Sequence, residues 1–340
     1  MPPSARIPAT VITGFLGAGK STLLRRVLTE QHGRRIAVIE NEFGEEDIDS
    51  DILVASGAEQ IIQMSNGCVC CSIRDDLRTT LGDLARRRSA GEIAFDQVII
   101  ETTGLADPGP VAQTFFRDAG IAAHYRPDAI LTLVDARFGP AQLAGRQEAR
   151  RQVGFADRLF LTKGDLVDAE QLDALGHHLR HLNPAAPQTA VRFGDVDLGQ
   201  VFDVGGFNLS ADLDPLPHDD DGTHGHDHGH GHRAHARHVH HDVDVNSLSF
   251  RSERPLNPRR FAQFLNAVVA SHGTRLLRYK GVLNLLGQER KVILQGVHEL
   301  MSYDDGVAWA PQEARLSKLV FIGLGLPREQ FLAALAGCVA

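Results

Sequence analysis

The residues with the clearest chemical potential form the segment Thr-Gly-Phe-Leu-Gly-Ala-Gly-Lys-Ser-Thr at positions 13–22. Gly14 and Gly19 bracket four residues and are followed by Lys20 and Ser21, which matches the pattern G-x-x-x-x-G-K-[ST] of phosphate-binding loops. Glycines let the backbone wrap around a phosphate, the first N–H groups of the following helix point at it, and the lysine neutralises its charge. The serine hydroxyl is placed to ligate Mg²⁺. We therefore expect a nucleoside triphosphate to contact Gly14, Gly17, Ala18, Gly19, Lys20, Ser21 and Thr22.

A second segment, Glu-Thr-Thr-Gly at positions 101–104, follows the apolar run 98–100. An acidic residue here can hold Mg²⁺ or its water, so Glu101 joins Lys20 and Ser21 as a predicted catalytic residue. Gly104 can approach the γ-phosphate. The alternative is that the segment only caps a helix. Asp49 is a weaker candidate for a further contact to Mg²⁺ or its water.

The base of the nucleotide is indicated by Thr162-Lys163-Gly164-Asp165, which resembles the guanine-reading [NT]-K-x-D signature. An aspartate at this position accepts hydrogen bonds from the ring and amino N–H groups of guanine, and adenine offers no matching pair of donors. The aliphatic part of Lys163 is expected to lie over the base. The pattern predicts GTP as the nucleotide, and the competing interpretation is a strand end that caps a helix.

A metal site is predicted from Cys68, Cys70 and Cys71, three thiols close enough to share one ion. Zn²⁺ is the usual metal of such a set in a reducing compartment. A fourth ligand must come from elsewhere, and Glu40 and Glu45 are candidates because their segment also follows an apolar strand. Two alternatives stay open: buried, inert cysteines, or a redox pair of Cys68 with Cys71.

A histidine-rich tract adds a second metal signal. Imidazoles alternate with glycines and aspartates in a stretch with almost no apolar residues, so the stretch cannot bury a core. We expect it to be a flexible linker that captures or stores metal loosely, although a solvated spacer is the simpler alternative. The candidate ligands are His224, His226, His228, His230 and His232.

Composition limits the class of protein. The chain has 340 residues and a formal net charge of −8, which argues against nucleic acid as the main partner. No apolar run approaches the roughly 18 residues needed to cross a membrane. Three of the four cysteines crowd together, which does not form a disulfide framework and indicates reduced thiols in the cytoplasm.

The elements that must position these residues follow from the apolar pattern. Short runs at 36–39, 98–100, 129–134 and 159–161 are apolar throughout, as expected of parallel strands buried on both faces. Helix candidates at 76–88 and 169–181 lie between and after them. The alternation predicts an α/β fold with a doubly wound, mostly parallel sheet and functional loops at the carboxyl ends of its strands.

A smaller C-terminal α+β domain is expected after the linker. A strand should begin near residue 243 with a change of register near Ser247, and Asn257-Pro258 should start a helix that ends at Gly273. Further strands are expected at 276–286, 292–300 and 319–324, with a last helix from about Pro327 and both helices on one side of the sheet. The predicted divisions are therefore 1–211, 212–242 and 243–340.

The motifs taken together resemble those of the CobW-like GTPases, and especially their YjiA branch. The glycine loop, Glu-Asn-Glu-Phe-Gly, Asn-Gly-Cys-Val-Cys-Cys, Glu-Thr-Thr-Gly-Leu-Ala-Asp-Pro and Thr-Lys-Gly-Asp occur in the family's order. Leu-Arg-Tyr-Lys-Gly and Gln-Gly-Val-His, at 277–281 and 295–298, resemble its second domain. The resemblance covers nearly everything except the histidine tract, and the Gly-Cys-x-Cys-Cys element distinguishes the family from other phosphate-loop proteins.

The resemblance implies a GTP-driven metallochaperone with slow intrinsic turnover that uses GTP, Mg²⁺ and Zn²⁺. Cobalt and nickel, which members of the family also serve, are the alternative metals. It implies delivery to a client metalloprotein and a nucleotide-dependent homodimer, in which Arg74 or Arg78 either acts across the dimer or forms a solvated helix face. A zinc buffer or sensor that stores metal on the histidines, with GTP as a gate, is the first alternative. A phosphate-loop kinase is the second, and the thiols and the guanine motif argue against it.

Overall fold

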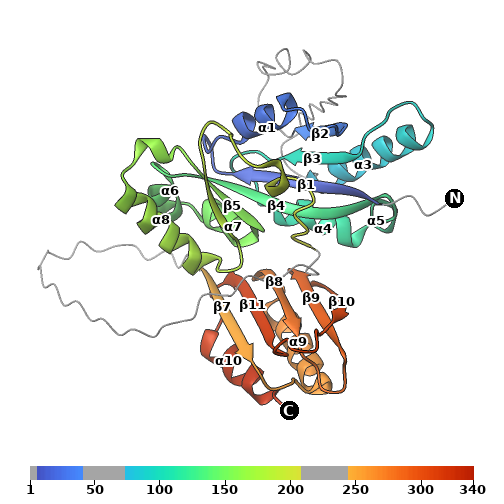
Figure 1. Ribbon diagram of the computed structural model, residues 1–340, viewed down its shortest axis with the longest axis vertical. Helices are drawn as coiled ribbons and strands as arrows, with labels where there is room; N and C mark the ends of the chain where they lie inside the picture. Colours follow the sequence, from blue (N-terminus) through green and yellow to red (C-terminus); the bar gives the residue numbers. More distant parts are fainter. Residues whose placement is uncertain (1–5, 41–72, 208–243) are drawn as a thin grey trace, which may run out of the picture.

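The computed structural model describes residues 6–40, 73–207 and 244–340, which form two sheets with their covering helices (Figure 1). The first sheet has the strand order β2-β3-β1-β4-β5-β6, and every neighbouring pair is parallel. Its strands are β1 (Ile7–Gly14), β2 (Ile36–Glu40), β3 (Gln97–Glu101), β4 (Tyr125–Asp135), β5 (Arg158–Thr162) and β6 (Gln188–Val191). The expected doubly wound parallel sheet is confirmed.

Both faces of this sheet are buried, which explains the continuous apolar runs. In β2, Ala37 and Ile39 belong to one core cluster, whereas Ile36 and Val38 belong to the cluster on the opposite face. Because side chains alternate between the faces of a strand, each apolar run supplies both cores at once.

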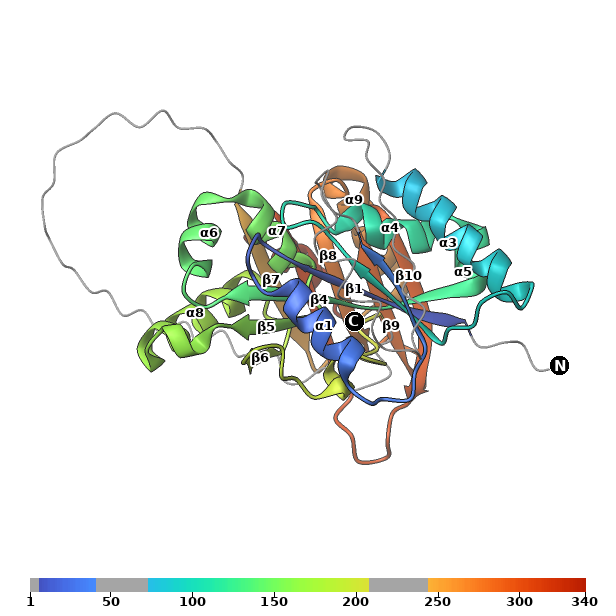
Figure 2. The same cartoon turned by 90° about the horizontal axis from the view of Figure 1, so that it is seen from above.

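Helices cover the two faces unequally. They are α1 (Lys20–Thr29), α3 (Ile73–Ser89), α4 (Gly109–Arg117), α5 (Ala119–His124), α6 (Gly139–Gly145), α7 (Gln147–Phe155) and α8 (Ala169–Leu182), with 3-10 turns η1 (Gly164–Leu166) and η2 (Leu198–Gln200). Figure 1 shows α1 on the side of the sheet away from the C-terminal sheet, and α4 and α7 on the side facing it; Figure 2 gives the view from above. The two long helices expected from the sequence are α3 and α8. Asp168 and Gln171 form a capping box at the start of α8.

The second sheet is antiparallel, with the order β10-β9-β8-β11-β7. Its elements are β7 (Val245–Ser252), α9 (Pro258–His272), β8 (Leu276–Leu283), β9 (Arg290–Val297), β10 (Leu300–Ala308), β11 (Ser317–Leu324) and α10 (Arg328–Gly337). The Asn257 side chain accepts hydrogen bonds from the N–H groups of Arg259 and Arg260, and Gly273 ends α9, as the sequence predicts.

Two expectations for this sheet are wrong. The single strand expected at 292–300 is two strands, because the chain turns at His298, whose φ of 53° is left-handed. The change of register expected near Ser247 does not occur, and β7 pairs with β11 without a bulge. Val245 and Leu248 lie on opposite faces of β7, and each face has its own core to fill.

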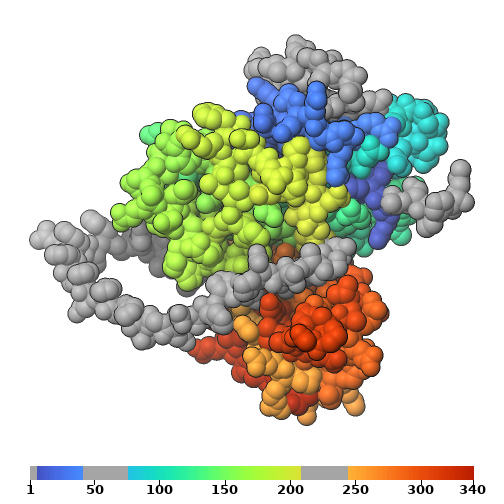
Figure 3. Space-filling model, viewed as in Figure 1, coloured from blue at the N-terminus to red at the C-terminus, as the bar shows by residue number. Residues whose placement is uncertain are grey.

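The antiparallel sheet is buried on both sides. One face packs with α9 and α10 around residues such as Phe261 and Phe331. The other face contributes Leu277, Val297 and Ile322 to the core of the first sheet. In the space-filling view the C-terminal part forms a smaller lobe (Figure 3). Within the residues that the structure describes, no helix is long and apolar enough to cross a membrane.

Candidate functional site

The glycine loop lies at the carboxyl end of β1, near the centre of the parallel sheet. Gly14 has φ of 141°, and a Cβ atom there would lie 2.4 Å from the carbonyl oxygen of Leu133 in β4. Gly17 and Gly19 have φ values of 75° and 98°, a region that residues with side chains rarely adopt. The three glycines thus allow the tight loop into α1 that a phosphate cradle requires.

The catalytic candidates lie together at the start of α1. Lys20 Nζ is buried and donates to the carbonyl oxygen of Gly14 at 3.0 Å. Ser21 Oγ donates to Glu101 Oε1 at 3.1 Å, so residues eighty positions apart meet at one point. A hydroxyl and a carboxylate are oxygen ligands of the kind that Mg²⁺ prefers, and this pair fits the ion.

Glu40 lies beside Glu101. The two residues end β2 and β3, and they are direct partners in the parallel register of these strands. Neighbouring strands lie roughly 4.8 Å apart, so the backbones of a candidate zinc ligand and a candidate magnesium residue are adjacent. The sheet therefore places Glu40 next to the predicted magnesium residue Glu101.

Gly104, the residue predicted to approach the γ-phosphate, lies against the glycine loop. A Cβ atom at Gly104 would lie 2.6 Å from the backbone nitrogen of Leu16, so only glycine fits this approach. Thr102 ties the start of the same segment to β1, because its hydroxyl donates to Thr13 Oγ1 at 2.8 Å. The segment after β3 and the glycine loop form one packed unit.

The guanine motif is joined to the glycine loop at the end of β5. Thr162 Oγ1 donates to the carbonyl oxygen of Ala18 at 2.8 Å. Lys163 has φ of 57°, and its Nζ donates to the carbonyl oxygen of Gly17 at 2.8 Å. Asp165 follows in η1 and is exposed. The motif is thus placed where it can contact a base whose phosphates lie on the glycine loop.

Sequence reasoning missed two residues of this site. Asp135 ends β4 and is almost fully buried; its Oδ2 pairs with Lys163 Nζ at 2.6 Å, and its Oδ1 accepts from the N–H groups of Arg137 and Phe138. An aspartate directly after the apolar run 129–134 was an available signal. Gln152 in α7 donates to the carbonyl oxygens of Gly104 and Ala106, and no local pattern announces it.

The C-terminal sheet reaches the same region through His298. Its ring packs edge-on against Phe155 with centroids 5.4 Å apart, and its Nε2 would lie 2.7 Å from a Cβ atom at Gly109. Burial is the largest influence and lowers the pKa of His298, although the carboxylates of Asp107 and Glu299 act in the opposite direction. Burial therefore favours the neutral form of the imidazole.

Several predicted ligands lie outside the described residues: Glu45, Asp49, Cys68, Cys70, Cys71 and the candidate histidines His224, His226, His228, His230 and His232. Of the predicted zinc ligands only Glu40 is described. In the described part of the chain, no three His, Cys, Asp or Glu side chains are grouped as a metal site would require.

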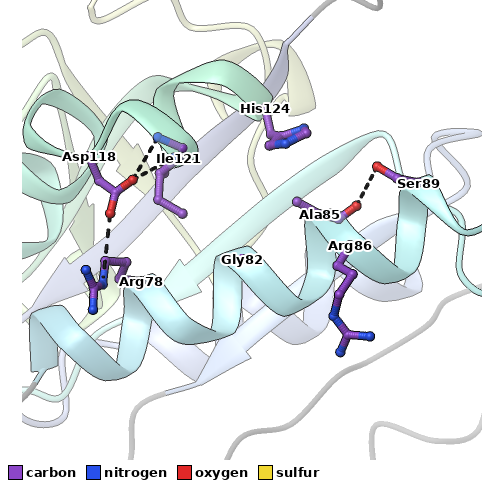
Figure 4. A pocket seen from close by; sticks show the side chains of 9 residues that line it. Arg78, Gly82, Ala85, Arg86, Ser89, Asp118, Ile121 and His124 are labelled. Atoms are coloured by element: carbon purple, nitrogen blue, oxygen red, sulfur yellow. Dashed lines mark hydrogen bonds and ion pairs between the residues drawn. The ribbon is translucent and has the colours of Figure 1, made fainter.

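A hollow of about 420 Å³ lies elsewhere, between α3 and α5 (Figure 4). Arg78 at its rim pairs with Asp118 at 3.9 Å and is 57 % exposed, which fits a solvated helix face and also leaves the guanidinium accessible to a second copy of the chain. His124, which also lines the hollow, precedes the amino end of β4. This part of the hollow therefore lies at the amino end of the strands, whereas the glycine loop lies at their carboxyl end.

Comparison with known proteins agrees with this geometry. The family model described as "CobW/HypB/UreG, nucleotide-binding domain" matches residues 8–190, and "Cobalamin synthesis protein cobW C-terminal domain" matches residues 245–339. The zinc chaperone YjiA of Escherichia coli (strain K12) is 39% identical over 97% of this chain and 98% of its own length. The zinc chaperone CobW of Pseudomonas aeruginosa is 33% identical over 94% of this chain and 88% of its own.

A solved structure is also similar along the whole chain. The crystal structure of Zn(II)-bound YjiA GTPase from E. coli superposes with a TM-score of 0.78 at 34% identity, covering 99% of this chain and all of that one. Both family models and both lobes therefore match in the same order, and the chain belongs to the CobW/HypB/UreG family, with a nucleotide-binding domain followed by a cobW C-terminal domain.

Proposed function

We propose that this protein is a GTP-hydrolysing metallochaperone that binds Zn²⁺ through Cys68, Cys70 and Cys71 and delivers it to a client metalloprotein under GTP control. The observation that carries the proposal is the strand register that sets Glu40 beside Glu101. Relatives along nearly the whole chain are named zinc chaperones, which supports zinc as the cargo.

Hydrolysis is assigned to the edge of the parallel sheet. The glycine loop holds the phosphates, Lys20 neutralises their charge, and Asp165 reads guanine. When bound, Mg²⁺ would neutralise the negative charge that develops on the transferred phosphoryl group. Ser21 and Glu101 hold that ion through their oxygen atoms, and Gly104 brings the segment after β3 to the γ-phosphate.

Coupling to zinc follows from the neighbouring carboxylates. A change at Glu101 when the γ-phosphate is present acts directly on Glu40, its partner in the adjacent strand. Glu40 precedes the segment that contains Glu45, Asp49 and the three cysteines. Such coupling is reciprocal, so if GTP strengthens zinc binding, zinc must strengthen GTP binding by the same factor.

The partners in this proposal are a client metalloprotein and a second copy of the chain, in the reducing cytoplasm where thiols persist. Leu16 and Leu105, beside the nucleotide site, are 55% and 53% exposed, and Phe138 is 52% exposed. Exposed apolar side chains that gather at one place, as Leu16 does with the segment of Leu105, can mark a protein interface. This supports a homodimer that forms across the nucleotide.

The experiment that tests the function is zinc transfer to a colourimetric acceptor of known affinity. Protein loaded with one Zn²⁺ per chain is mixed with the acceptor in the presence of GTP·Mg²⁺, a non-hydrolysable analogue, or GDP. Transfer should be fastest while GTP is being hydrolysed, and Ser21→Ala should abolish the acceleration. Transfer at one rate in all three conditions would instead identify a zinc buffer or sensor, with storage on the histidines.

A further inference from the structure

One buried glutamine holds the segment that carries Gly104. Gln152 in α7 is 1% exposed, and its Nε2 donates to the carbonyl oxygens of Gly104 at 3.2 Å and of Ala106 at 3.0 Å. A single side chain thus ties together two backbone carbonyls of the segment that passes over the glycine loop.

The preceding residue of α7 holds the end of the same segment. Arg151 Nη1 donates to Asp107 Oδ2 at 2.8 Å, and Asp107 Oδ1 accepts from the N–H group of Gly109 at 2.8 Å. Consecutive residues of one helix therefore hold the segment at Gly104, at Ala106 and at Asp107.

The helix that carries these side chains is itself fixed on two sides. The hydroxyl of Thr132 in β4 donates to the backbone oxygen of Gln152 at 3.0 Å. Two residues later, Gly154 lies against the C-terminal sheet, where a Cβ atom would come within 2.8 Å of Leu277 Cδ1. These contacts fix the position of α7 between the two sheets, and with it the two side chains that hold the segment.

The backbone of Gly104 has little space in which to move. Its backbone lies against the nitrogen of Leu16 in the glycine loop, with no room for a methyl group. In the proposed GTPase reaction this segment contacts only the γ-phosphate, whereas the glycine loop and the motif around Asp165 contact the rest of the nucleotide. A misplacement of about 1 Å at a reacting group can lower a rate on the order of a hundredfold.

We infer that Gln152 and Arg151 are positioning residues for GTP hydrolysis, which act by holding the segment from Gly104 to Asp107 at the γ-phosphate. The inference rests on the proposed GTPase function. Gln152 and Arg151 should then affect the binding and hydrolysis of GTP but not the binding of GDP, because GDP lacks the γ-phosphate that this segment contacts.

The test compares Gln152→Met with the wild-type chain and with a matched control, Gln97→Met. Gln97 is also a buried glutamine, but it starts β3, at the end of the strands opposite to the glycine loop, and it donates to Thr10 Oγ1. The readouts are kcat for GTP hydrolysis and the dissociation constants of GDP and a non-hydrolysable GTP analogue, all with saturating Mg²⁺.

Gln152→Met should lower kcat at least ~10-fold and weaken the GTP analogue, while GDP affinity stays within about twofold, because two hydrogen bonds are lost at the segment alone. Gln97→Met should leave all three values within about twofold. If Gln152→Met weakens GDP and the GTP analogue equally, its role is structural and the inference is overturned. A wild-type chain that does not hydrolyse GTP overturns the proposed function instead.

Arg151 supplies a second test that does not depend on a core substitution. Its side chain is 31% exposed, so its replacement leaves the core intact. Arg151→Met should lower kcat with GDP affinity unchanged, and Arg151→Lys should recover part of the rate because it keeps a cation at Asp107. Equal rates for wild type, Arg151→Met and Arg151→Lys would contradict a positioning role for this residue.

Discussion

Asp157 is the carboxylate whose loss should most weaken the junction between the two sheets. It is 1% exposed and lies between α7 and β5, where its Oδ1 accepts from Arg278 Nη2 at 2.8 Å and from Lys280 Nζ at 2.9 Å. Its Oδ2 accepts from the N–H group of Ile130 at 2.9 Å. Both cations belong to β8 and are buried as well. One carboxylate thus compensates two buried charges from the other sheet.

Asp157→Asn removes the negative charge that both buried cations contact. Removing one partner of a buried ion pair typically costs about 3–5 kcal/mol, and here the remaining charges also repel each other. The cost should appear as a lower midpoint of urea unfolding, followed by circular dichroism and by the fluorescence of Trp309, the single tryptophan. Lys280→Met in the same chain should restore part of the loss, because one cation is then removed.

The control is Asp96→Asn, which removes a carboxylate bound to Arg35 on the surface, where the side chains are 44% and 53% exposed. Exposed pairs contribute only about 0–1 kcal/mol. A loss below about 1 kcal/mol for Asp157→Asn, equal to the control, would refute the reasoning about buried compensation.

The pH dependence has a definite sign. Burial by itself would raise the pKa of Asp157, but Arg278 and Lys280 outweigh it and hold the pKa below the ordinary range. A lowered carboxyl pKa contributes stability that is fully present above the unfolded value of about 3.9 and is lost as pH falls through the folded value. The difference between wild type and Asp157→Asn should therefore persist at neutral pH and shrink only below about pH 4.

Three further predictions follow from the site. Gly14→Ala should weaken GDP binding and cost about 1–3 kcal/mol in urea unfolding, since its Cβ would lie 2.4 Å from the oxygen of Leu133; unchanged binding would contradict the close packing. Asp165→Asn should abolish the preference for GTP over ATP in competition binding, and equal affinities in the wild type would contradict guanine recognition. Deletion of residues 218–241 should lower the zinc stoichiometry measured by equilibrium dialysis and leave GTP hydrolysis intact; an unchanged stoichiometry would exclude storage on the histidines.

Most of the parallel sheet was predictable because its signals are local. Strands buried on both faces must be apolar at successive positions, and the run from 36 to 39 carries that pattern without reference to the rest of the chain. The glycine loop was likewise predictable, since its spacing encodes its backbone shape. The segments that lie beside the glycine loop were predictable as well, because the carboxyl ends of parallel strands meet at one edge of the sheet.

The antiparallel sheet was harder because β10 lacks an apolar run. It is an edge strand with exposed residues such as Asp304 and Asp305, and charges of this kind protect an edge from pairing with other chains. The turn before it uses a left-handed His298 where glycine or asparagine would have been a clear signal. Polarity and an unusual turn residue therefore concealed the strand.

Long-range polar contacts were not predictable at all. Gln152 and Gly104 are 48 positions apart, and Asp157 and Arg278 are 121 apart. The local sequence around each of these residues does not indicate which distant polar group its side chain will contact. Such contacts depend on how α7 is packed between the sheets, which only the folded chain defines.

Control of zinc binding by the nucleotide should be visible in the equilibrium affinity for Zn²⁺. It should be measured by chelator competition with a non-hydrolysable GTP analogue and then with GDP, on protein lacking residues 218–241. We expect at least a tenfold difference in Kd, about 1.4 kcal/mol, that disappears when Cys68, Cys70 and Cys71 are all changed to serine. Equal zinc affinities in the two nucleotide states would contradict it.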